Sequence, residues 1–335
     1  MSKIRISYAE MLQVFRQVLL RNGFSESKAD ACARIFAGNS LDGIYSHGIN
    51  RFPRFIEYTM RGFVRADAEP ALVHAAGAME QWNGQLGPGP LNAVFCTTRA
   101  MQLASEHGIG CVAIANTNHW MRGGTYGWQA AEKGFAFIGW TNTEANMPAW
   151  GAKDSRLGNN PLVLALPYNT EAIVLDFAMT QYSYGKMEAT QLEDSLLSFP
   201  GGFDITGNLT QHPGEILHSR RALPIGYWKG AGLSLLLDLL ATILSAGLST
   251  RELSLNEAEY GVSQVYIAFS LEKLGNFPTI QKTISDIISD YKNSLPERSS
   301  SEIRYPGERV LLTRKNNLAE GIPVLESIWK KILEL

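Results

Sequence analysis

The chain has 335 residues, 45% of them hydrophobic, which is enough for one large domain or two ordinary domains with well-buried cores. Thirty Lys and Arg residues nearly balance 32 Asp and Glu residues, and no dense basic block is present. This charge balance does not favour a nucleic-acid-binding protein. The three cysteines lie far apart and form no Cys-x-x-Cys pair, so reduced and mostly buried thiols are expected.

Two segments of the sequence bear on localisation. The N-terminus has no apolar secretory core, which predicts a cytoplasmic protein. Residues 230–248 approach the length of a membrane span but carry Asp238 near their middle. We interpret this stretch as a buried core helix packed on a sheet, so no membrane partner is predicted.

The first quarter of the chain has helical patterns. Ser7 and Glu10 have the spacing of a capping box, and apolar residues then repeat at helical period to residue 19. A second helix is expected from about Ser27 to Leu41, and Pro53 can open a third over residues 54–60.

Helices and strands alternate in the middle of the chain. We expect helices at 91–106, 126–133 and after Lys229, and strands at 111–115, 135–140, 162–166, 173–177 and 265–271. The tail returns to helix at 280–291 and 324–333, with a polar loop at 296–302. The sequence therefore predicts an α/β domain, residues 77–276, inserted into a helical domain formed by residues 1–76 and 277–335.

The glycine pattern excludes one common cofactor fold. A Rossmann domain needs Gly-x-Gly-x-x-Gly between a strand and a helix, where the pyrophosphate meets the helix N-terminus. The nearest match, residues 108–113, follows a helix and enters a strand, so we interpret it as a turn. Composition and motifs alone do not indicate a nicotinamide cofactor.

His47 and Arg51 are four residues apart in the segment 45–51. If this segment is helical or tightly turned, both side chains face one way, and a carboxylate held by Arg51 would place its adjacent carbonyl near His47. That geometry suits reduction of a 2-oxo acid. The alternative is a helix-capping histidine and a surface ion pair, which spacing alone favours.

Three further side chains have two interpretations each. His119 follows the strand at 111–115, where ligands bind in α/β domains, or is a hydrogen-bonded loop histidine. Asp176 accepts from a ribose hydroxyl or caps the next helix, and Lys229 binds a phosphate or is solvated. His47 and His119 have no third suitably spaced ligand in the sequence, so no metal site is predicted.

Four blocks of residues together resemble the type-2 malate/L-lactate dehydrogenase family: 45–55, 118–124, 126–134 and 226–230. The resemblance extends over essentially the whole chain. It implies an NAD(P)-binding fold unrelated to the Rossmann fold, a helical and an α/β domain with the active site between them, and a homodimer.

The resemblance also implies a reaction and its residues. It implies NADH-dependent reduction of a small sugar acid at its 2-oxo carbonyl, with NADP as an open alternative. His47 matches the family's proton donor, and Arg51 and His119 match positions near the substrate. The implied cofactor contacts are Ala172, Ile173, Val174, Leu175, Asp176, Phe177, Ala178, Trp228, Lys229, Gly307, Glu308 and Arg309.

The sequence departs from the family pattern at three places. Related sugar-acid reductases have Gly-His-Glu where this chain has Gly307-Glu308-Arg309, so that cofactor contact is expected through the backbone rather than the side chains. Asn159 and His212 also differ from many members. The rival hypotheses are malate, lactate, ureidoglycolate or cyclic imino acid substrates, a metal-dependent lyase or hydrolase, and a sugar-acid binding protein without catalysis.

Overall fold

A seven-stranded sheet forms the centre of the molecule. The computed structural model describes residues 3–298 and 302–335. Only β3 and β4 pair in parallel, and the other neighbours in the sheet are antiparallel. The order across the sheet is β2 (Ala71–Ala76), β3 (Met79–Asn83), β4 (Ile109–Thr117), β12 (Val262–Ser270), β5 (Phe135–Thr141), β8 (Leu162–Tyr168) and β9 (Glu171–Phe177).

Helices cover both faces of this sheet because its strands alternate apolar side chains between the faces. Val112 and Tyr266 face a core shared with α4 (Gly89–His107) and α5 (Gly124–Ala131). Ala113 and Val265 face the opposite core, beneath α8 (Trp228–Ser245). The Trp140 indole fixes α8 to the sheet by donating to the Leu237 carbonyl at 3.1 Å.

Gly108 forms the turn between α4 and β4, whereas Gly110, which we predicted to lie in that turn, is already in β4. Gly108 ends α4 in the left-handed conformation, with φ of 88°. A Cβ at Gly110 would lie 2.1 Å from the carbonyl oxygen of Ala100 in α4. Only glycine therefore lets α4 pack this closely on β4.

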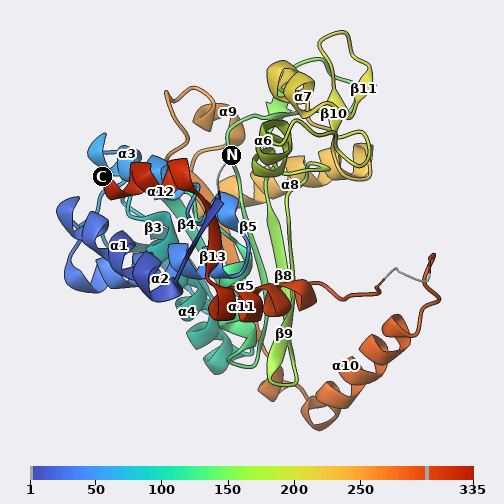
Figure 1. The fold of residues 1–335 in the computed structure, drawn as a ribbon. Helices are drawn as coiled ribbons and strands as arrows, with labels where there is room; N and C mark the ends of the chain where they lie inside the picture. The colour runs from blue at the N-terminus through green and yellow to red at the C-terminus, as the bar shows by residue number, and fades with distance from the viewer. Residues whose placement is uncertain (1–2, 299–301) are drawn as a thin grey trace.

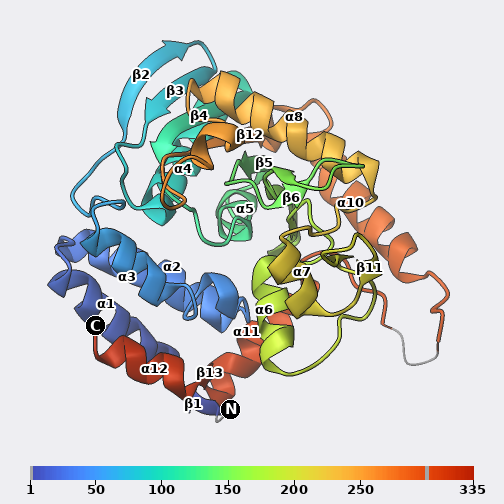
Figure 2. The same ribbon diagram turned by 90° about the horizontal axis from the view of Figure 1, so that it is seen from above.

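A second layer is built from both ends of the chain (Figure 2). Ser7 caps α1 by accepting from the Glu10 amide, and Ser25 caps α2, two residues before the predicted start. The layer contains α1 (Tyr8–Arg21), α2 (Glu26–Leu41), η1 (Tyr45–His47), α3 (Phe52–Met60), α12 (Glu326–Leu333), and the antiparallel pair β1 (Lys3–Ile6) and β13 (Ile322–Leu325).

The remaining elements lie at the edges of these two layers. Figure 1 shows a small lobe around α6 and α7 on one side, and α10 extending away from the body. The bounds are β6 (Met147–Pro148), β7 (Ser155–Leu157), α6 (Tyr184–Leu192), β10 (Gly202–Phe203), β11 (Leu209–Thr210), α7 (Pro213–Ser219), α9 (Thr250–Leu253), η2 (Leu271–Lys273), α10 (Phe277–Lys292) and α11 (Glu308–Glu320).

The mixed α/β class is confirmed, while the division into 1–76 plus 277–335 and 77–276 stays a prediction. Two elements do not follow this domain division. Strand β2 lies before the predicted boundary at 76/77 but pairs with β3 in the sheet. Helix α10 lies against β8 instead of the helical layer, and Gln281 accepts from the Asn169 amide at 3.2 Å. The polar loop predicted at 296–302 lies partly outside the described residues.

Helix α8 is buried on one side only. By length and composition it is the one helix in the described residues that could cross a membrane. It instead packs along β4, β5 and β12, as a core helix does. Its outer side leaves Leu236 55% and Ile243 69% exposed. The predicted buried helix is therefore correct for its sheet-facing side and wrong for its outer side.

A buried carboxylate joins the two layers. Asp42, directly after α2, is 6% exposed and accepts from Arg122, which lies beyond β4 and is also 6% exposed. The same carboxylate accepts from Arg314 of α11 at 2.6 and 2.9 Å. One carboxylate thus compensates the positive charges of two guanidinium groups from separate parts of the chain.

Replacing Asp42 by Asn should destabilise the fold by about 3 kcal/mol, because the buried Arg122 charge loses its counter-charge. Urea unfolding followed by circular dichroism measures this change. The matched control is Asp154→Asn, whose exposed pair with Arg156 contributes little. Equal stabilities for the two variants would contradict a structural role for Asp42.

Candidate active site

The segment that carries His47 is held closely against α2. The Asn39 side chain donates to the His47 carbonyl at 2.9 Å, and Ser40 Oγ accepts from the Ile49 amide at 2.8 Å. A Cβ at Gly48 would lie 2.2 Å from Ser40 Oγ, so a side chain at this position would push the segment away. The backbone of His47 is therefore fixed by the helical layer.

His119 reaches the same place from the sheet. It lies just beyond β4, and its Nδ1 accepts from the Met121 amide at 2.9 Å. The neutral ring therefore carries its proton on Nε2. The rings of His47 and His119 stack with centroids 5.6 Å apart and an interplanar angle of 23°. The tertiary fold thus brings the two candidate histidines together.

Both imidazoles are held in the neutral form. Burial is the main cause that lowers the pKa of His47 to about 4, and the positive charges of Arg51 and Arg122 add to it. Burial, followed by the charge of Arg51, keeps the pKa of His119 well below its usual value. Since protonation here opposes nearby cations, an anion bound beside Arg51 would favour the charged form of His47.

A small pocket adjoins His119. The Arg51 guanidinium lines it and, within residues 3–298 and 302–335, makes no hydrogen bond or ion pair. The predicted alternative of a surface ion pair at Arg51 is therefore not observed. The full lining is Arg51, Arg54, Phe55, Tyr58, Val64, Asn118, His119, Met121 and Glu259. Free guanidinium donors at such a position suit a carboxylate ligand.

Glu259 provides a negative charge on the wall of this pocket. It lies in the loop before β12, and its Oε2 accepts from the Glu144 amide at 3.2 Å. Burial raises the pKa of the Glu259 carboxyl, while the positive charge of Arg51 opposes this effect.

The three segments expected to bind a cofactor meet along the edge strand β9. The Val174 amide donates to the Pro306 carbonyl at 3.1 Å, which places Gly307 beside the middle of the strand. The Ile225 amide donates to the Met179 carbonyl at 2.9 Å, just beyond the end of the strand. Trp228 and Lys229 follow Ile225 closely and are both exposed at the start of α8.

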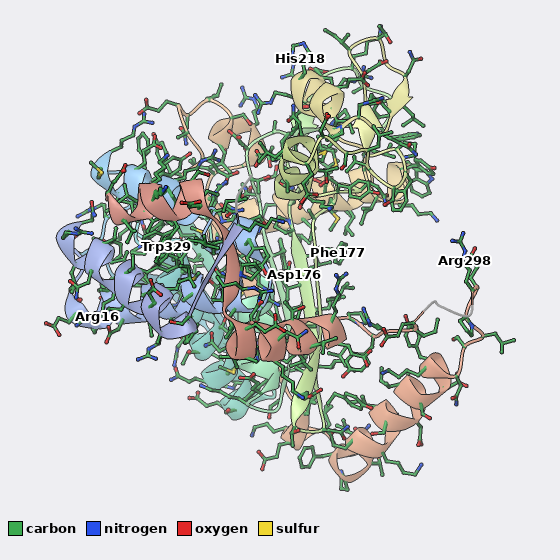
Figure 3. The ribbon with its side chains drawn as sticks, viewed as in Figure 1. Arg16, Asp176, Phe177, His218, Arg298 and Trp329 are labelled. Atoms are coloured by element: carbon green, nitrogen blue, oxygen red, sulfur yellow. The ribbon has the colours of Figure 1, made fainter. Side chains whose placement is uncertain are left out.

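Asp176 interacts with a helix other than the expected one. Its Oδ2 accepts from the Gly124 amide at 2.7 Å, at the start of α5, whereas the sequence suggested the next helix along the chain. Figure 3 shows Asp176 and Phe177 on opposite sides of β9, as strand alternation requires. The other carboxylate oxygen stays available for a ligand.

The segment around Gly307 packs directly against β9. Gly307 has a φ of 94°, and a Cβ there would lie 3.2 Å from the Val174 amide nitrogen and 3.5 Å from the Trp128 ring. The buried Trp128 indole nitrogen has no hydrogen-bond partner in the described part of the chain. Glu308, by contrast, pairs with Lys292 and accepts from the Tyr305 amide. The segment therefore offers a ligand its backbone more than side-chain charge.

Sequence reasoning missed several residues of the site. Arg54 and Arg122 lie inside the blocks that carried the family resemblance, but their spacing had no distinctive pattern. Asp42 and Glu259 had no signal at all, because each acts through partners distant in the sequence. Within the described residues, no group of three or more His, Cys, Asp or Glu side chains could hold a metal ion.

Comparisons with known proteins agree with this architecture. The family model for malate/L-lactate dehydrogenase matches residues 6–333. The 2,3-diketo-L-gulonate reductase of Klebsiella pneumoniae strain 342 is 45% identical over 333 residues, which cover 99% of this chain and all of that protein.

Two solved structures are similar throughout. Malate dehydrogenase from Entamoeba histolytica has a TM-score of 0.94 at 21% identity, covering 99% of this chain and 97% of that one. Malate dehydrogenase from Pyrococcus horikoshii OT3 has a TM-score of 0.89 at 26% identity, covering 99% and 94%. The fold is thus that of a class of oxidoreductases that lack a Rossmann domain. The chain belongs to the malate/L-lactate dehydrogenase family, which confirms the resemblance found in the sequence.

The low pKa of His47 predicts a pH dependence of stability. Between the usual value of 6.5 and about 4, the unfolded chain binds a proton that folded His47 does not, so stability falls as pH decreases through this range. Replacing His47 by Gln should remove part of this fall. Urea unfolding at several pH values measures it, with exposed His74→Gln as the control. Parallel curves for all three proteins would contradict a neutral, half-buried His47.

Proposed function

We propose that the chain reduces 2,3-diketo-L-gulonate to 3-keto-L-gulonate with NADH. One observation carries the proposal: neutral His47 and His119 stack beside a pocket that contains the unpaired Arg51 guanidinium. The full-length similarity to proteins named 2,3-diketo-L-gulonate reductase supports the substrate. The rival substrates within the family stay as alternatives that the same assay compares.

In the proposed reaction each side chain has one role. Arg51 holds the substrate carboxylate by paired hydrogen bonds, which places the adjacent carbonyl near the histidines. Because the carboxylate offsets the charge of Arg51, substrate binding raises the pKa of His47, which then donates its proton to the developing alkoxide. His119 donates a hydrogen bond to the same oxygen through Nε2.

The cofactor would lie along the edge of the sheet. The residues proposed to hold it are 172–178, Trp228, Lys229 and 307–309, with Gly307 keeping its segment close to β9 and Lys229 supplying a positive charge. Bound NADH supplies the hydride, and the protein supplies orientation and charge. Parallel assays with NADPH decide whether NADP is also accepted.

Loss of NADH absorbance with 2,3-diketo-L-gulonate, oxaloacetate and pyruvate tests the proposal. Wild type should prefer the sugar acid, and His47→Gln should lower its turnover on the order of a hundredfold because the proton donor is lost. NADH binding, followed by its fluorescence, should stay unchanged in this variant. Unchanged turnover would remove His47 from this role, and binding of the sugar acid without NADH oxidation would favour a binding protein.

We also propose that the chain forms a homodimer through the outer side of α8 and the adjoining face of β8. Leu164 and Leu166 are exposed there, beyond the area that α8 covers. Together with the outer leucines of α8 they form a large apolar surface, which is typical of a protein interface. The nearby α10 adds an amphipathic helix in which only Ile280 is buried.

A charge on this surface should dissociate the dimer. Leu236→Glu should shift the mass measured by light scattering from two chains to one, because the interface would bury an unpaired carboxylate. Met60→Glu, at a residue 72% exposed in the helical layer, is the control. A monomeric wild type, or a Leu236→Glu variant that remains dimeric, would refute this interface.

A further inference from the structure

We propose that Glu259 selects substrates by charge, admitting 2-oxo acids with one carboxylate and a hydroxylated chain while excluding dicarboxylates. The inference rests on the proposed reduction of a 2-oxo acid at His47 and Arg51. It concerns the part of the pocket that would surround the rest of the substrate.

The charges that line the pocket add up to one positive unit. Arg51 and Arg54 are cations, His119 is neutral, and the adjacent Arg51 charge favours the anionic form of Glu259 against the effect of its burial. One substrate carboxylate therefore balances the pocket. A second carboxylate would leave an uncompensated negative charge beside Glu259, in surroundings that screen charge less than water does. Without Glu259 the two arginines would suit a dicarboxylate.

Glu259 is positioned as a hydrogen-bond acceptor. The Glu144 amide holds its Oε2 at 3.2 Å, while its Oε1 has no hydrogen-bond partner among residues 3–298 and 302–335. A substrate hydroxyl can donate to this oxygen, whereas an ionised carboxylate has no proton to donate. Glu259 therefore stabilises a bound hydroxyl and repels a carboxylate at the same place.

Asn118 provides a second acceptor in the same lining. It is only 3% exposed, and its Oδ1 has no partner in the described part of the chain. The amide is oriented with Nδ2 towards three carbonyl oxygens, those of Phe63, Leu86 and Gly87 at 3.0, 2.9 and 3.1 Å, which share its two hydrogens. A buried acceptor without a donor costs free energy, which a substrate hydroxyl would recover. Both free acceptors thus favour a polyhydroxylated chain.

The test compares kcat/KM for 2,3-diketo-L-gulonate, oxaloacetate and pyruvate in wild type and Glu259→Gln. In the variant, kcat/KM for oxaloacetate should rise on the order of tenfold, because the repulsion between Glu259 and the second carboxylate is removed. Its kcat/KM for the sugar acid should fall about tenfold, because a charged hydrogen-bond acceptor is replaced by a neutral one. Pyruvate, which has no chain to contact Glu259, should change by less than about twofold.

Two further variants separate charge from structure. Glu257→Gln removes a nearby exposed carboxylate that pairs with Arg61 at 3.0 Å, and it should keep the wild-type preferences. Glu259→Asp keeps the charge, so it should still reject oxaloacetate while losing activity with the sugar acid. If Glu259→Gln changed all three substrates by one factor, Glu259 would be structural and the proposal wrong.

The outcome also distinguishes this inference from the proposed function. The ratio of kcat/KM for oxaloacetate to kcat/KM for pyruvate reports on Glu259 whether or not the sugar acid is reduced. Wild type that reduces pyruvate but not the sugar acid would refute the proposed substrate alone. Wild type that reduces oxaloacetate in preference to pyruvate would refute the charge selection.

Discussion

The pairing of one buried carboxylate, Asp42, with Arg122 and Arg314 is the constraint on which the rest of the structure depends. It joins the end of α2, the loop beyond β4 and the middle of α11, three parts that sequence separates widely. The first carries the His47 segment, the second carries His119, and the third begins at Gly307 beside β9. Because an unpaired charge in this location is costly, the three parts keep one relative arrangement. The proposed proton donor, substrate pocket and cofactor edge are positioned together for this reason.

The same surroundings determine the chemistry. Burial and neighbouring cations keep His47 and His119 neutral in the free protein, and we propose that a bound anion makes His47 acidic. An unpaired arginine attracts that anion, and Glu259 limits how much negative charge it brings. In this proposal, substrate recognition and proton donation are two effects of one electrostatic balance. The cofactor edge then needs little side-chain charge, which agrees with the backbone contacts around Gly307.

Local patterns predicted most of the long elements because their period comes from neighbouring residues. The capping serine at 7, the helix at 91–106 and the strand at 111–115 all have counterparts in α1, α4 and β4. The short strands β1, β2, β3 and β13 were missed, since four to six residues carry too little periodicity. Helices α6 and α11 were also missed; α11 buries only Asn317, so it has no apolar stripe that a helical pattern would reveal. The absence of a glycine fingerprint correctly excluded a Rossmann domain, and the family resemblance was confirmed. Glu259 and Asp42 were not found, because their importance comes from partners that no local pattern reveals.

By itself the sequence determined the secondary structure of its long segments, the family, and the identity of His47, Arg51 and His119 as candidates. These features follow from residue type and near-neighbour spacing, which do not depend on how the chain packs. Only the tertiary structure decided that the two histidines stack, that the Arg51 guanidinium is unpaired, and that β9, Gly307 and the start of α8 meet. Only the tertiary structure also decided the net charge of the pocket. Burial and pairing depend on distances between remote segments, and these distances exist only once the layers have packed.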